Sequence, residues 1–167
     1  NAPTRMFVPR ARMGEVADIA KQTVEGFAPG APDSGAKIGP VVSQAQFDKI
    51  QGLIERAIAD GATAVVGGPG RPDDLPTGYY VKPTVFTNVT NDMEIARTEV
   101  FGPVLVVIGY DSIDEAIKVA NDTEYGLAGY VSGKDVDEVR LGCRDRRGVG
   151  RVDAARQRGR GRRRHGG

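Results

Sequence analysis

Apolar residues in this chain recur at helical spacing in some segments and form short continuous runs in others. The helical spacing predicts helices over residues 15–27, 44–60, 93–97, 113–120 and 135–141. Two of these helices follow a capping box, in which Ser43 stands three residues before Gln46 and Ser112 stands three residues before Glu115. The helix after Ser43 has the clearest apolar stripe of the chain.

The continuous runs predict extended segments over residues 5–9, 62–66, 79–86, 104–108 and 130–132. The run from Val104 to Ile108 contains five apolar residues with no polar alternation, which is typical of a strand covered on both faces of a parallel sheet. Predicted strands alternate with predicted helices along the chain. The pattern therefore predicts a layered α/β fold, with a mainly parallel sheet flanked by helices.

The chain has 167 residues, 40% of them apolar, which is enough for one domain with its own core. No apolar run approaches the roughly 20 residues that cross a bilayer, and the first residues lack the apolar region of a signal peptide. We therefore expect a cytoplasmic protein without a membrane segment. With one cysteine, Cys143, and one histidine, His165, we expect neither a disulfide framework nor a metal site.

The last 26 residues, Gly142 to Gly167, differ in composition from the rest of the chain. They contain ten Arg, seven Gly, no Lys and two acids, so their net charge is near +8. The first 141 residues contain 13 Lys and Arg against 20 Asp and Glu, so the overall charge of +1 describes neither part. This composition is typical of a GC-rich coding strand translated out of frame. We expect residues 142–167 to be a frameshifted, disordered tail.

The segment Glu99-Val100-Phe101-Gly102-Pro103 is the most distinctive short motif. Glycine followed by proline predicts a stiff turn that holds Glu99 and Phe101 at the edge of the sheet, and ligand sites in α/β sheets gather at strand ends. A carboxylate there could accept hydrogen bonds from vicinal hydroxyls, and the ring could support a flat heterocycle. The residues alone leave an alternative open, in which Glu99 is a solvated acid and Phe101 is an ordinary core residue.

Six segments, in order, resemble the aldehyde dehydrogenase superfamily. They are Asn1–Arg5, Ile38–Ser43, Gly61–Gly68, Gly78–Val85, Glu99–Pro103 and Asn121–Leu127. Residues 1–141 are accordingly identified as part of the catalytic domain of such an enzyme. Asn1 aligns with the position after the family's nucleophilic cysteine.

The resemblance implies an oxidoreductase that converts an aldehyde to a carboxylic acid with NAD or NADP through a cysteine thioester. It implies that Glu99 binds the hydroxyls of the nicotinamide ribose and that Phe101 packs near the nicotinamide. Because the nucleophile would precede Asn1, we expect the chain to hold no catalytic residue and to be inactive alone. Cys143 does not replace that nucleophile, since no base or oxyanion donor accompanies it. We expect the parent enzyme to be a homo-oligomer and this chain to lack its C-terminal pairing strand.

Two alternatives belong to other functional classes. The Arg-rich tail could bind nucleic acid without sequence preference, although it lacks the aromatic residues that stack on bases. The chain could also be an inert remnant, in which the apolar run from Val104 to Ile108 is left uncovered.

Overall fold

The structure is a computed structural model that describes residues 4–126 and 128–133. The predicted helix at 135–141, Cys143, His165 and the tail at 142–167 lie outside the described residues, as does Asn1. Contacts between Cα atoms divide the chain into two units, residues 1–123 and 124–167. All helices and strands of the described residues belong to the first unit.

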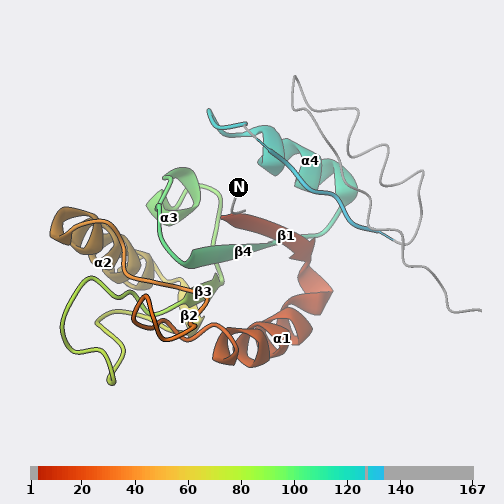
Figure 1. Cartoon of the computed structure of the whole chain (residues 1–167). Coiled ribbons are helices and arrows are strands. Elements are labelled where there is room, and N and C mark those ends of the chain that lie inside the picture. The colour runs from red at the N-terminus through yellow and green to blue at the C-terminus, as the bar shows by residue number, and fades with distance from the viewer. Residues whose placement is uncertain (1–3, 127, 134–167) are drawn as a thin grey trace, which may run out of the picture. The chain divides into compact units, whose positions relative to one another are not determined.

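The described part contains a four-stranded sheet with the strand order β1-β4-β3-β2 (Figure 1). The strands are β1 (Arg5–Pro9), β2 (Thr63–Val66), β3 (Thr84–Thr87) and β4 (Val104–Tyr110). Both β1 and β3 run parallel to β4, whereas β2 lies on the edge and runs antiparallel to β3. The mainly parallel sheet predicted from the sequence is therefore confirmed.

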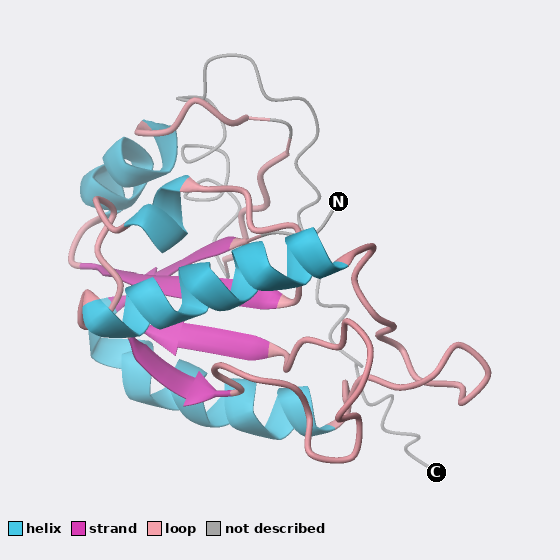
Figure 2. Cartoon of the chain, turned by 90° about the vertical axis from the view of Figure 1, so that its left-hand side faces the viewer, coloured by secondary structure: helices cyan, strands magenta, loops and turns pink. Residues whose placement is uncertain are grey.

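Helices cover both faces of this sheet (Figure 2). They are α1 (Met13–Glu25), α2 (Gln44–Ala59), α3 (Glu94–Arg97) and α4 (Ile113–Asn121), with a short 3-10 turn at Arg10–Arg12 before α1. One apolar cluster joins α2 and α3 to the sheet, and a second joins α1 to the opposite face. The layered α/β architecture is thus confirmed, although α1 starts two residues before the predicted helix.

Strand β4 shows how both faces become apolar. Val104, Val106 and Ile108 pack in the cluster under α2, while Leu105 and Val107 pack in the cluster under α1. Successive side chains of a strand point to opposite faces, so an unbroken apolar run can fill two clusters. The expectation that this run would be uncovered in an inert remnant is wrong, because Val107 is 0% and Ile108 is 5% exposed.

Two extended segments predicted from the sequence differ in the structure. Of residues 79–86, only the part from Thr84 onward forms a strand. Pro83 has no N–H for a ladder, and the carbonyl of Tyr79 accepts instead from the backbone N–H of Val41 at 2.9 Å. The extended segment predicted at 130–132 is not a strand in the part of the chain that the structure describes.

Both predicted capping serines act as expected, but the second half of each capping box is absent. Ser43 accepts from the backbone N–H of Gln46, and Ser112 accepts from that of Glu115, each at 3.2 Å. The Glu115 carboxylate reaches one residue further back and accepts from the backbone N–H of Asp111 at 2.7 Å. The contact made by each serine could be predicted from the local sequence. The side chains of Gln46 and Glu115 bind other partners instead.

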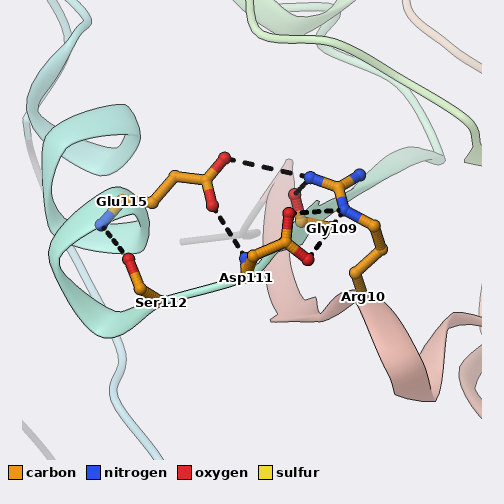
Figure 3. A network of polar contacts seen from close by, with 5 residues as sticks. All are labelled: Arg10, Gly109, Asp111, Ser112 and Glu115. Carbon is orange, nitrogen blue, oxygen red and sulfur yellow. Dashed lines mark hydrogen bonds and ion pairs between the residues drawn. The ribbon is translucent and has the colours of Figure 1, made fainter.

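Glu115 belongs to a polar network where β1 and β4 end (Figure 3). Arg10 Nε donates to Asp111 Oδ2 at 2.9 Å, its Nη2 donates to the carbonyl of Gly109 at 3.2 Å, and Nη2 lies 3.8 Å from Glu115 Oε1. The network links the turn before α1 to the turn before α4. Its side chains are largely exposed, so we expect a modest contribution to stability.

Candidate functional site

The motif Glu99–Pro103 connects α3 to β4 and so lies at the amino ends of the parallel strands. The carbonyl of Pro103 accepts from the backbone N–H of Thr84 at 2.8 Å, which joins the motif to the start of β3. Ligand sites in open parallel sheets usually lie at the carboxyl ends of the strands. That rule does not predict a ligand site at the amino ends of the strands. The case for a ligand site at this motif therefore rests on the geometry of the motif and on its resemblance to the family.

Glu99 and Phe101 are exposed on either side of a buried anchor. Val100 is 2% exposed and packs in the cluster under α2, whereas Phe101 is 68% exposed. Phe101 is therefore not a core residue. Glu99 is also exposed, and no described side chain binds its carboxylate. The structure thus presents one carboxylate and one aromatic ring from positions two residues apart on the same loop.

The backbone of the motif is strained at Phe101, which has φ 53°. A left-handed conformation at a residue other than glycine costs on the order of 1–3 kcal/mol, and such strain often occurs at functional sites. Gly102 is favoured for a different reason. A Cβ on Gly102 would lie 2.6 Å from Cδ1 of Ile50 on α2, so a side chain there would force Ile50 or the loop to shift.

Two polar side chains of α2 bind the backbone of this loop. Lys49 Nζ donates to the carbonyl of Glu99 at 3.0 Å and lies 5.5 Å from the centre of the Phe101 ring. Gln46 Nε2 donates to the carbonyls of Val100 and Phe101 at 2.8 and 3.2 Å. Sequence reasoning assigned Gln46 to the capping box and did not find Lys49. The only sequence signal for a shared role was the three-residue spacing of Gln46 and Lys49, which places both side chains on one side of a helix.

Ion pairs fix α3, the helix that leads into the motif. The Arg56 guanidinium binds Glu94 at 2.6 Å and lowers the pKa of that carboxyl. At the other end of α3, Arg97 binds Asp122 at 3.1 Å, and this hydrogen bond is the main reason why the pKa of Asp122 is lowered. Because these side chains are largely exposed, the pairs orient α3 more than they stabilise the fold.

Arg5 anchors the start of β1 to the segment around Asn91. Its Nη2 donates to Asn91 Oδ1 at 2.7 Å and to the carbonyl of Val119 at 2.8 Å. Asn91 Nδ2 in turn donates to Asp122 Oδ2 at 2.6 Å. Arg5 thus has a structural role in joining β1 to the end of α4.

The described residues include no cysteine or histidine, since Cys143 and His165 lie outside them. Within 4–126 and 128–133, no group of three or more metal-ligating side chains is gathered. No helix of this described part has the length and apolar character needed to cross a membrane. An exposed carboxylate and an exposed ring on one loop suit a ligand with vicinal hydroxyls and a flat heterocycle.

Comparison with known sequences gives a family match over the whole chain. The sequence model of the aldehyde dehydrogenase family matches residues 1–167. A Staphylococcus haemolyticus protein named as an aldehyde dehydrogenase is 47% identical over 139 residues, which are 83% of this chain and 29% of the relative. The chain therefore spans less than a third of the length of the curated relatives that it matches.

Solved structures give the same result. Aldehyde dehydrogenase C from Pseudomonas syringae, in complex with NAD+ and octanal, has a TM-score of 0.88 and 45% identity, and the match covers 93% of this chain and 32% of that one. The Mycobacterium tuberculosis aldehyde dehydrogenase complexed with NAD+ has a TM-score of 0.84 and 41% identity, with 90% and 31% covered. The family match and these structural similarities together show that the chain belongs to the aldehyde dehydrogenase family.

Proposed function

We propose that this chain supplies the nicotinamide-ribose-binding segment of an NAD(P)-dependent aldehyde dehydrogenase. The single observation that carries the proposal is the exposure of Glu99 and Phe101 on either side of the buried Val100. The Glu99 carboxylate accepts hydrogen bonds from the two ribose hydroxyls, and the Phe101 ring packs near the nicotinamide. Both NAD and NADP carry this ribose, so the proposal covers either cofactor.

The residues of the motif fit this group. Glu99 has an accessible carboxylate with two acceptor oxygens, and a bidentate contact with vicinal hydroxyls uses both. The cofactor, when bound, supplies a hydride acceptor for the oxidation of an aldehyde to a carboxylic acid. The relatives with NAD+ or with octanal support the assignment of cofactor and substrate class. This chain's residues hold and orient the cofactor, and the proposal gives them no covalent step.

Nuclear magnetic resonance tests this proposal on the 167-residue chain with nicotinamide mononucleotide as the probe. We expect the largest shift changes at Glu99 and Phe101, and a weaker response to nicotinamide, which lacks the ribose. Glu99→Gln should weaken binding, because an amide offers only one acceptor oxygen to the hydroxyls. Glu55→Gln is the matched control, since Glu55 is exposed on α2 and has no role in the motif. Shift changes confined to other residues, or equal binding by Glu99→Gln, would refute the proposal.

The described residues include no cysteine, the nucleophile that the family uses, and this leads to a second test. The 167-residue chain mixed with an aldehyde and NAD+ should produce no NADH above background. Aldehyde-dependent absorbance at the NADH wavelength, abolished by heat denaturation of the chain, would show that a nucleophile is present after all.

We also propose that residues 142–167 are translated out of frame, although the match to the family model extends over residues 1–167. Curated relatives match over 139 or 140 residues, close to the length of the part before the Arg-rich tail. Translating the coding DNA in its two other frames beyond codon 141 tests this. A continued α/β pattern in one frame is expected. Failure of both frames to continue it would contradict the proposal and favour a genuine Arg-Gly tail.

A further inference from the structure

Three consecutive carbonyls of the candidate site are bound by side chains of α2. Lys49 donates to the carbonyl of Glu99, and Gln46 donates to those of Val100 and Phe101. None of the three carbonyls accepts from a backbone N–H in the part of the chain that the structure describes. The path of this loop therefore depends on the first two turns of α2.

The two bonds from Gln46 lie on either side of the strained residue. The carbonyl of Val100 belongs to the peptide plane before the Cα of Phe101, and the carbonyl of Phe101 belongs to the plane after it. The relative orientation of these two planes defines φ and ψ of Phe101. Because one side-chain amide donates to both planes, at 2.8 and 3.2 Å, it restricts both dihedral angles together.

Nothing in the side chain of Phe101 itself favours a φ of 53°. The ring is 68% exposed, so little burial is gained by pointing it outward, and phenylalanine is not among the residues that adopt left-handed backbone readily. The strain must be offset by neighbouring contacts. These contacts include the buried Val100, the close packing of Gly102 on Ile50, and the two hydrogen bonds from Gln46. Lys49 adds a hydrogen bond to the carbonyl of Glu99 and lies 5.5 Å from the centre of the Phe101 ring.

We propose that Gln46 is a positioning residue that holds Phe101 in its left-handed conformation and thereby presents the Phe101 ring and the Glu99 carboxylate together. Its effect on ligand binding rests on the proposed function, whereas its effect on the backbone of Phe101 does not. Gln46 acts through the two peptide planes that flank the Cα of Phe101.

The backbone effect is tested by the ¹³Cα and ¹³Cβ shifts of Phe101 in the 167-residue chain, which depend on φ and ψ. Gln46→Glu has nearly the same shape but has no N–H to donate at neutral pH. We expect it to move the Phe101 shifts toward values of an ordinary extended or helical backbone. Gln46→Ala should give the same change and guards against an effect of the added charge. Unchanged Phe101 shifts in both variants would overturn the proposal.

Gln44→Glu is the matched control. Gln44 lies in the first turn of α2, is exposed, and binds only Asp48 of the same helix, at 2.6 Å. The substitution introduces the same change of an amide to a carboxylate without touching the loop. It should leave the Phe101 shifts in place, and an equal change with both substitutions would assign the effect to helix charge and refute a specific role for Gln46.

Binding of nicotinamide mononucleotide provides the functional readout. If the variants keep the competent backbone in a minor fraction of molecules, the apparent Kd rises by the inverse of that fraction, and we expect about a tenfold increase. Weaker binding with unchanged Phe101 shifts would mean that Gln46 contacts the ligand directly, which overturns the positioning role. No response at Glu99 in the wild-type chain would refute the proposed function, while the Phe101 shifts would still decide the role of Gln46.

Discussion

Gly102 packs directly on α2, so we expect a side chain at this position to destabilise the protein. A Cβ on residue 102 would lie 2.6 Å from Cδ1 and 3.2 Å from Cγ1 of Ile50. Ile50 is 0% exposed and cannot move aside without displacing other core side chains. Overpacking of this kind costs about 1–3 kcal/mol, so Gly102→Ala should lower the free energy of unfolding by that amount. Urea unfolding followed by circular dichroism measures the change.

A double-mutant cycle separates this clash from other causes. Ile50→Val removes Cδ1, the closest atom, and alone should cost about 0.5–1.5 kcal/mol. In that background, Gly102→Ala should cost clearly less than in the wild type. Gly39→Ala is the control, because Gly39 also precedes a proline but has nothing within 4 Å of its would-be Cβ. The explanation fails if Gly102→Ala is as stable as the wild type or costs the same in both backgrounds.

Three further predictions concern a helix cap, the strained residue and an ion pair. Ser43→Ala removes the acceptor for the Gln46 N–H and should lower the free energy of unfolding in urea by about 1 kcal/mol; an unchanged midpoint would contradict it. Phe101→Gly relieves the φ of 53° and should raise the urea stability by about 1 kcal/mol, while nuclear magnetic resonance titration shows weaker binding of nicotinamide mononucleotide. Arg56 lowers the pKa of Glu94 in the folded state. The ion pair therefore stabilises the folded state fully at pH values above the ordinary carboxyl pKa of about 4.3. This stabilisation is lost as the pH falls through the lowered pKa of the folded state. The stability difference between the wild type and Arg56→Gln should therefore shrink as the pH falls from 7 to about 3, and a constant difference would exclude an electrostatic origin.

The parts of the fold that follow from local pattern could be predicted from the sequence. The unbroken apolar run at 104–108 identified a strand with two covered faces, and the structure places it between β1 and β3. The stripe after Ser43 identified the helix that packs on one of these faces. Where a proline interrupts the pattern, at Pro83, the expected strand is shortened, because a residue without an N–H cannot extend a ladder.

The sequence motif located the candidate site, but it did not predict the backbone conformation and the contacts that form the site. The sequence indicated Glu99 and Phe101, yet nothing local shows that Phe101 has φ 53° or that its ring lies outside the core. The partner of Gln46 is 54 residues away in the sequence, so its long-range contact cannot be distinguished beforehand from a local cap. Positive φ at a bulky residue depends on such tertiary contacts and not on residue preference.

The buried side chain of Val100 makes this surface loop a part of the cooperative folding unit. Exposed loops usually open by local fluctuations that require little free energy. Here the loop cannot open without withdrawing Val100 from the cluster formed by α2 and the sheet. Amide exchange and proteolytic cleavage at this position should therefore approach the rates set by global unfolding. A ligand would meet a preformed surface and would lose little affinity to the cost of ordering it.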